Sequence, residues 1–318
     1  MTDFALTRRA LLAGSAAAAL APTTQLAFGA SPDALKIILE FRIYGANSPM
    51  FMSQKSIFPK HNLDVTPIGS AGSGEAVRDV AAGLYKFGLA DPSVVVAFAG
   101  NNPKVSPKII LPIFDKVPAC VISFKKKPVK TLADLKHVKI GTGSSDAGAK
   151  LFPALMRLNN IDIKSLDITT TDVKLRDAML MTGKVDAVIG FDYTSVFNLI
   201  GNGVKLEDIE LLYFSDMGFN MFGNALIAHP DVIQKEPELV KRVADAIAQT
   251  WIYANTHRQE SVDAVMQREK LLNAKVELAR LSWVLDRRIL TPNVKKNGLG
   301  AFEMSRLTKG IDLIKEGF

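Results

Sequence analysis

Residues 69–91, GSAGSGEAVRDVAAGLYKFGLAD, decide the fold of this chain. A glycine- and serine-rich turn runs into an amphipathic helical pattern that ends near Gly83. A short apolar strand follows and stops at Asp91-Pro92, a pair typical of another helix N-terminus. Two helix N-termini then face one edge of a sheet, where backbone N–H groups can hold a small polar or anionic ligand. The stretch therefore indicates binding rather than catalysis.

Strands alternate with helices on both sides of this stretch. Apolar or alternating runs predict strands at residues 35–39, 63–68, 108–114, 119–124, 138–141, 166–170, 186–191, 210–215 and 224–228. Helical patterns fill residues 48–60, 75–82, 172–182 and 192–202, and continue from residue 236 almost to the C-terminus. This alternation predicts an α/β fold with mostly parallel sheets.

Two features favour two lobes over one sheet. A second glycine-serine turn at 141–145 resembles the one at 69–74, and extended stretches near 115–120 and 216–223 can carry the chain across and back. We therefore expect lobe one to comprise residues 30–117 and 222–318, and lobe two residues 118–221. The alternative is one α/β domain with two unrelated turns, although a chain of 318 residues usually divides.

The N-terminal sequence predicts a cleavable export signal at residues 1–29. Arg8-Arg9 precedes an alanine-rich apolar run, and Ala27-Phe28-Gly29 is a plausible cleavage site. The run is too short for a permanent membrane span. Paired arginines favour the twin-arginine route, and the alternative is an ordinary secretory leader. Both predict a periplasmic protein.

Composition excludes several classes of function. Removing two arginines and one aspartate with the signal lowers the net charge from +7 to +6, and no basic run interleaved with aromatics predicts nucleic-acid binding. The single Cys120 permits no intrachain disulfide. The sequence lacks a His-Glu-x-x-His motif, a Gly-Lys-Ser/Thr phosphate loop and a Gly-x-Ser-x-Gly elbow. We expect no catalytic residues, metal or cofactor.

Several short motifs, in order along the chain, resemble one family. They are IFPKHNLDV at 57–65, GSG at 72–74, VAAG at 80–83, FGLAD at 87–91, TLADLK at 131–136, VKIG at 138–141, GKVDA at 183–187 and EPELV at 236–240. Together they resemble the solute-binding proteins of the nitrate, sulfonate, taurine and thiamine-pyrimidine-precursor group of ABC importers. The resemblance implies a two-lobed periplasmic binding protein fold of type II, a ligand in the cleft, closure by hinge motion and docking on permease subunits.

The chain departs from this family near the expected site. Ser56-Ile57 stands where relatives have Gly-Tyr, and Phe41-Arg42 where many have Asp-Trp. The ligand therefore does not carry over. From strand ends, turns and crossovers we predict a ligand-binding set of Arg42, Tyr44, Asn47, Ser70, Ser73, Asp91, Thr142, Ser144, Asp192, Tyr193, Asp216 and Phe219.

Each predicted contact has a structural alternative. Arg42 can bind a carboxylate, sulfonate or phosphate, or pair with Glu40. The serines, Thr142 and Asp91 can bind the ligand or cap helices, the aromatic residues can stack on it or pack in the core, and Asp216 can lie in a hinge.

The function expected from the sequence is capture of a small solute for an ABC importer. The basic balance and Arg42 favour an anion, and the aromatic residues favour a planar or sulfonate-like one. We expect a monomer. The alternative is an exported enzyme or a sensor-associated binding subunit on the same fold.

Overall fold

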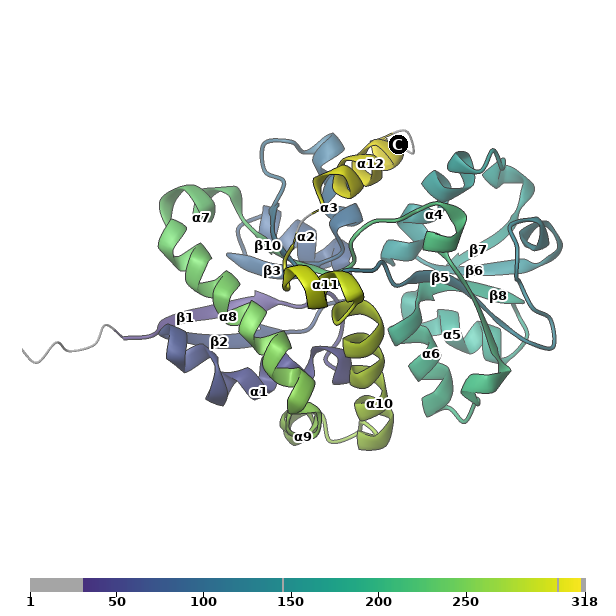
Figure 1. Cartoon of the computed structure of the whole chain (residues 1–318). Coiled ribbons are helices and arrows are strands. Elements are labelled where there is room, and N and C mark those ends of the chain that lie inside the picture. Colours follow the sequence, from purple (N-terminus) through teal and green to yellow (C-terminus); the bar gives the residue numbers. More distant parts are fainter. Residues whose placement is uncertain (1–30, 145, 302, 316–318) are drawn as a thin grey trace, which may run out of the picture. The chain divides into compact units, whose positions relative to one another are not determined.

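The computed structural model describes residues 31–144, 146–301 and 303–315 (Figure 1). The predicted export signal, residues 1–29, lies outside the described residues. Strands in the described part are β1 (Asp33–Ile38), β2 (Leu63–Ile68), β3 (Phe87–Ala90), β4 (Lys108–Pro112), β5 (Ala119–Phe124), β6 (Lys139–Gly143), β7 (Asp167–Thr171), β8 (Ala187–Phe191), β9 (Ile209–Tyr213) and β10 (Ala225–Ala228).

Helices cover both sheets that these strands form. The α-helices are α1 (Ser48–Ser56), α2 (Ser73–Ala81), α3 (Pro92–Asn101), α4 (Ala147–Leu158), α5 (Val173–Met181), α6 (Asp192–Gly201), α7 (Pro230–Lys235), α8 (Pro237–Thr256), α9 (Arg258–Arg268), α10 (Ala274–Val284), α11 (Pro292–Asn297) and α12 (Met304–Lys315). Short helical turns are η1 (Gly45–Asn47), η2 (Phe58–His61), η3 (Ala133–His137), η4 (Ile163–Ser165), η5 (Leu206–Asp208), η6 (Phe214–Met217) and the π-helical η7 (Leu285–Ile289).

The strands form two five-stranded sheets of the same design. Sheet one has the order β2-β1-β3-β10-β4, and sheet two has β7-β6-β8-β5-β9. In each sheet four strands point the same way and one, β10 or β5, is antiparallel to its neighbours. The expected parallel direction is thus confirmed for most strands, and the reversed strand makes each sheet mixed.

The reversed strand in each sheet is the one that arrives from the other sheet. β4 ends at Pro112, and the chain crosses through residues 113–118 into β5. β9 ends at Tyr213, and residues 214–224 return the chain to β10. A strand that enters at the carboxyl edge of its neighbours must run against them. This fold is the two-lobed periplasmic binding protein fold, and we call each sheet with its helices a lobe. The sheet memberships fit the predicted lobe boundaries, which stay a prediction.

Two local predictions needed correction. The helix predicted for residues 48–60 ends at Ser56, and η2 follows it, with Pro59 at its start and Asn62 in the left-handed region at its end. The predicted turn at 141–145 is wrong in its first part, because residues 141–143 lie in β6 and pair with β7. The β-carbon of any larger residue at Gly141 would stand 3.2 Å from side-chain atoms of Val185, so glycine serves packing there.

The C-terminal helices connect the two lobes. α10 packs against α6 of lobe two, and α12 packs against α3 of lobe one and α4 of lobe two. α10 and α12, which belong to the helical layer of lobe one, therefore also contact helices of lobe two.

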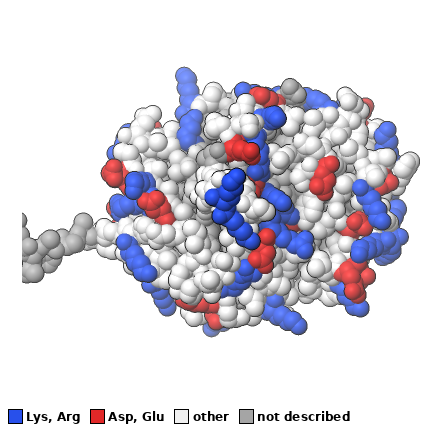
Figure 2. Space-filling view, viewed as in Figure 1, with Lys and Arg blue, Asp and Glu red and all other residues white. Residues whose placement is uncertain are grey.

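The surface is of mixed charge. On the face shown in Figure 2, lysine and arginine side chains are interspersed with acidic ones. Within the described ranges, we find no helix that combines the length and apolarity needed to cross a membrane.

Candidate functional site

A buried cavity lies between the carboxyl ends of the two sheets. Its volume is about 30 Å³, and both lobes line it. Lobe one contributes Glu40, Phe41, Ala71, Gly72 and Ser73, and lobe two Asp146, Ala147, Val173, Phe191, Tyr193 and Thr194. This volume suits about one water molecule, whereas pockets for organic ligands measure roughly 300–1,000 Å³. In this structure the cavity therefore has no room for an organic solute.

Four helices begin at this cavity: α2, α4, α5 and α6. Asp146 caps α4 by accepting a hydrogen bond from the Gly148 N–H at 2.8 Å, and Asp172 caps α5 in the same way through the Lys174 N–H. The start of α2 has no side-chain cap. Its N-cap residue Gly72 has φ 147° and ψ 168°, a conformation almost restricted to glycine. The sequence 69–74 thus opens one helix N-terminus toward the cavity, as predicted.

Three polar residues line up at the edge of sheet one, and we call them the acceptor row. Glu40 follows β1, Asp91 follows β3 and Asn224 precedes β10, three neighbouring strands. Their exposed fractions are 5%, 0% and 2%. Glu40 Oε2, Asp91 Oδ2 and Asn224 Oδ1 are buried and have no hydrogen-bond partner among the described residues.

Burial alters the acidity of the two carboxyl groups in the acceptor row. It raises the pKa of Glu40 to about 7, although hydrogen bonds from the backbone and from the side chains of Tyr44 and Asn47 act in the opposite direction. It likewise raises the pKa of Asp91 to about 6, against the hydrogen bonds from Ser93. Neither carboxyl group forms an ion pair in the described part of the chain.

Two tyrosines, one from each lobe, lie over the acceptor row. Tyr44 stacks on Tyr193 with ring centroids 6.2 Å apart and an interplanar angle of 9°. The Tyr44 hydroxyl donates to Glu40 Oε1 at 3.1 Å, and Asn224 Nδ2 donates to the Tyr193 hydroxyl at 2.9 Å. Both rings are at least 98% buried. Separation of the lobes breaks this stack, because its two rings belong to different lobes.

Arg176, which contacts Asp146 of the lobe-two wall, already has carboxylate partners. Arg176 is 1% exposed and its guanidinium donates to Asp146, to Asp177 Oδ1 at 3.0 Å and to the Ser195 hydroxyl. It therefore balances lobe-two carboxylates. The described residues that line the cavity include two carboxyl groups and no lysine or arginine.

A second polar network joins lobe two to the C-terminal helices, and we call it the Asp192 latch. Asp192 is fully buried and accepts hydrogen bonds from Trp283 Nε1 at 2.6 Å, from the Tyr213 hydroxyl at 3.1 Å and from Arg288. Nearby, Arg280 Nη1 donates to the Tyr193 carbonyl at 2.6 Å. These contacts tie the start of α6 to α10 and η7.

The structure places several predicted ligand residues in structural roles. Asp192 belongs to the latch. Asn47 is fully buried, accepts from the Tyr44 N–H and donates to the Arg42 carbonyl. Phe219 is fully buried in the core. Asp216 is exposed and borders a different hollow, with Met217.

Arg42 lies outside the cavity. Its side chain is exposed, and Nη2 donates to Asn198 Oδ1 at 2.7 Å across the two lobes. It lines an open groove of about 910 Å³ rather than the buried cavity. The alternative, a pairing of Arg42 with Glu40, does not form in this structure, where Glu40 accepts a hydrogen bond from Tyr44.

The predicted serines and threonine divide between the cavity wall and its surroundings. Ser73 lines the cavity and accepts a hydrogen bond from the Asp91 N–H at 3.1 Å. Ser70 donates to the Leu39 carbonyl, so neither serine caps α2 as the alternative supposed. Thr142 contacts Thr170 through their hydroxyls at 3.1 Å, and Ser144 is exposed. Asp91 does cap α3, accepting from the Ser93 N–H at 2.9 Å.

Sequence reasoning missed two of the three residues in the acceptor row. Glu40 entered only as a partner for Arg42, and Asn224 only as the start of a strand. Each is a single polar residue at the cleft end of an apolar strand, a signal that could have identified both. No group of three or more His, Cys, Asp or Glu residues suited to a metal occurs in the part of the chain that the structure describes.

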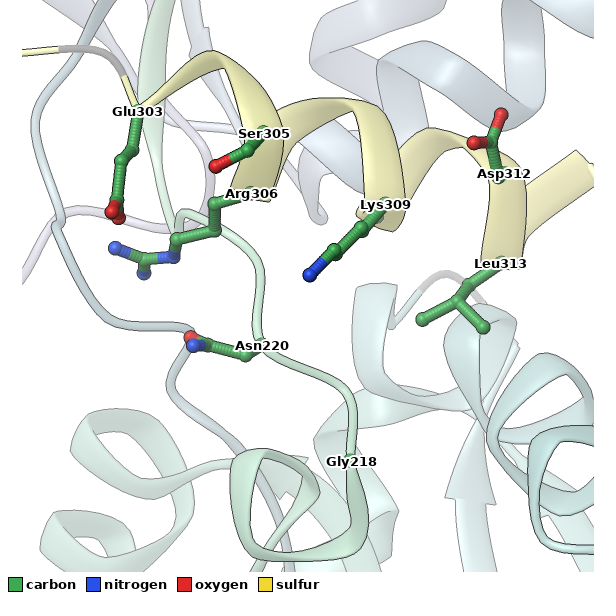
Figure 3. Close-up of a pocket in the computed structure, with 9 residues that line it drawn as sticks. Gly218, Asn220, Glu303, Ser305, Arg306, Lys309, Asp312 and Leu313 are labelled. Carbon is green, nitrogen blue, oxygen red and sulfur yellow. The ribbon is translucent and has the colours of Figure 1, made fainter.

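A further hollow of about 550 Å³ lies between the return crossover and α12 (Figure 3). Asn220 points into it from the crossover, and Arg306 and Lys309 point into it from α12. Glu303 and Asp312 also line it, so its charge is mixed. Arg306 is engaged with Asp115 at 3.0 Å, which fixes α12 to the outgoing crossover. This hollow lies beside the crossover and not at the strand ends.

Comparison with known proteins agrees with this geometry. Residues 49–261, more than half of the chain, match the NMT1/THI5-like family. The chain belongs to the NMT1/THI5-like family. A Brucella abortus (strain 2308) protein named only as a binding protein is 25% identical over 276 residues, covering 85% of this chain and 81% of that protein.

Solved structures share the fold of this NMT1/THI5-like protein. The periplasmic aliphatic sulphonate binding protein SsuA from Escherichia coli is 16% identical with a TM-score of 0.63, covering 90% of this chain and 93% of that one. The alkanesulfonate-binding protein SsuA from Xanthomonas axonopodis pv. citri, bound to MOPS, is 16% identical with a TM-score of 0.61, covering 90% and 95%. At this identity the likeness extends to the fold.

Proposed function

We propose that this protein captures a small solute between its lobes and delivers it to an ABC importer. The observation that carries the proposal is the buried cavity at the facing carboxyl ends of both sheets, lined by residues of both lobes. A site divided in this way binds best when the lobes are together, so the solute stabilises the joined form. A relative named as a binding protein and sulfonate-binding proteins of the same fold support this role.

The proposal includes an extracytoplasmic location. The Arg8-Arg9 leader supports export to the periplasm, and periplasmic neighbours of the same fold agree. Permease transmembrane subunits are the proposed partners, and the protein acts as a monomer. We propose binding without turnover, because the described residues that line the cavity include no histidine, cysteine or lysine that could serve as a nucleophile or its base.

The direct test is native mass spectrometry of the full chain expressed with its leader and recovered from the periplasm. We expect the mature mass, the mass of a monomer, and a retained small molecule that dissociates at higher collision energy. A thermal-shift screen with that molecule should then raise the melting temperature according to mass action. Absence of any retained molecule, together with a flat screen of transported solutes, would refute the proposal.

A further inference from the structure

The acceptor row carries information about the charge of the solute. It supplies three buried oxygen atoms without hydrogen-bond partners among the described residues, from Glu40, Asp91 and Asn224. Each buried oxygen without a hydrogen-bond partner destabilises the folded protein by roughly 1–3 kcal/mol. Three of them at neighbouring strand ends are therefore strongly destabilising unless a ligand pairs with them. Oxygen acceptors pair with N–H donors or cations.

The row becomes reachable when the lobes separate. Glu40 lines the cavity directly, and Ser73 of the cavity wall contacts the backbone of Asp91. Tyr193 of lobe two covers Asn224 through its hydroxyl. Withdrawal of lobe two would remove that ring from Asn224, while Tyr44 stays beside Glu40 as a flat wall.

We infer that the solute is a small planar cation with N–H donors, of the amidinium or guanidinium class, and that the acceptor row binds its nitrogen atoms. The inference rests on the proposed function and reverses the sign of the ligand expected from the sequence. A flat donor-bearing group matches both the stacked rings of Tyr44 and Tyr193 and the oxygen atoms below them.

The charges around Glu40 support this assignment. Asp91 follows the neighbouring strand β3, and Asp146, before α4, lines the same cavity as Glu40. The Tyr44 hydroxyl donates to Glu40, and the Tyr193 ring stacks on that of Tyr44. Arg280 lies 5.0 Å from the centroid of the Tyr44 ring and is paired with Glu277 at 2.8 Å. Arg176 is engaged by Asp146 and Asp177. An arriving cation therefore meets two carboxyl groups, those of Glu40 and Asp91, that form no ion pair with any described residue.

Matched probes test the sign of the ligand. Benzamidinium and benzenesulfonate carry opposite charges on the same ring, and free guanidinium tests the head group alone. We expect calorimetry to detect binding of benzamidinium but not of benzenesulfonate. Because a carboxylate binds a cation and a protonated carboxyl does not, affinity should rise about tenfold between pH 6 and pH 8 as Glu40 ionises around pH 7.

Variants assign the binding to the row. Glu40→Gln should lower benzamidinium affinity at least tenfold and flatten its pH profile, and Asp91→Asn should lower it further. Glu236→Gln, which changes a carboxyl group in an exposed pair with Lys86, is the matched control and should change neither. Circular dichroism and the melting temperature establish that each variant is folded.

Three results would overturn the inference. They are binding of benzenesulfonate but not benzamidinium, failure of both cationic probes to bind, and unchanged benzamidinium affinity in folded Glu40→Gln. The proposed function is judged separately, since an anionic solute retained in native mass spectrometry would leave that function standing and remove only the cation.

Discussion

The Asp192 latch allows a sharp prediction about how the lobes are held. Asp192→Asn preserves shape but removes the charge that faces Arg288, whose side chain is 6% exposed. Asp192 Oδ2 accepts from Trp283, Tyr213 and Arg288. An asparagine must place its NH₂ group against either these donors or the Tyr193 N–H, which also donates to Asp192.

The cost follows from the buried charge left behind. Removing one partner of a buried pair costs about 3–5 kcal/mol. For a chain of this size each kcal/mol lowers the melting temperature by roughly 2–4 °C, so we expect a fall of about 6–20 °C. The assay is thermal denaturation followed by calorimetry and circular dichroism at pH 7.5, without added solute.

A double variant separates charge from packing. Asp192→Asn with Arg288→Met removes both charges and should melt above Asp192→Asn alone, giving a favourable coupling in the cycle. Retention of the wild-type melting temperature by Asp192→Asn would refute the latch. Loss of solute affinity with unchanged stability would instead restore Asp192 as a ligand contact.

Three further predictions concern the effect of pH on stability, packing at two glycines and the open groove that Arg42 lines. The pKa of Glu40 is about 7 in the folded protein and 4.5 ordinarily, so between these pH values the folded state binds a proton that the unfolded state has lost. The free energy of unfolding should therefore be retained below pH 4.5 and fall by about 3 kcal/mol as the pH rises to 7. In urea unfolding, the free energy of unfolding of Glu40→Gln should rise relative to that of the wild type between pH 4.5 and pH 7. A constant difference between the two proteins over this pH range would contradict the prediction. Gly45→Ala should destabilise the protein by more than about 2 kcal/mol, since its β-carbon would stand 2.4 Å from the Glu277 carbonyl oxygen. The control Gly100→Ala, whose β-carbon would have no atom within 4 Å, should be neutral or stabilising in the same thermal denaturation. Equal effects of the two substitutions would contradict this reasoning. Arg42→Ala removes an exposed contact and should change stability by less than about 1 kcal/mol and solute affinity by less than about threefold in calorimetry, whereas complete loss of binding would return Arg42 to the site.

The sequence predicted the fold well because the fold depends on local patterns. Alternating strands and helices, Asp91 before Pro92, and the motifs shared with the family each report on neighbouring residues. The two-sheet arrangement follows from their order. The turn at 141–145 was partly wrong because its glycines belong to a strand that packs closely on its neighbours, Gly141 against Val185 and Val188 and Gly143 against Val173.

The site was harder to predict because its residues are defined by distant partners. Asp192 looks like a free polar residue after a strand, yet Trp283 and Arg288, about ninety residues later, engage it. Arg42 looks like an anion receptor, yet it lies in an open groove. Glu40 and Asn224 come to the same edge of sheet one, with β3 between their strands, only through the return of the chain into that sheet.

That return has a consequence for synthesis of the chain. All strands of sheet two lie between residues 119 and 213, whereas β10 fills the place between β3 and β4 of sheet one. Until residue 228 has left the ribosome, β3 and β4 present unpaired edges, which are templates for aggregation. Closing the connection between β4 and β10 costs only about 2 kcal/mol more in chain entropy than closing a ten-residue loop. The long connection therefore delays completion of sheet one but lowers its stability little. A chain truncated before Ala225 would keep every strand of sheet two and leave sheet one open along both of those edges.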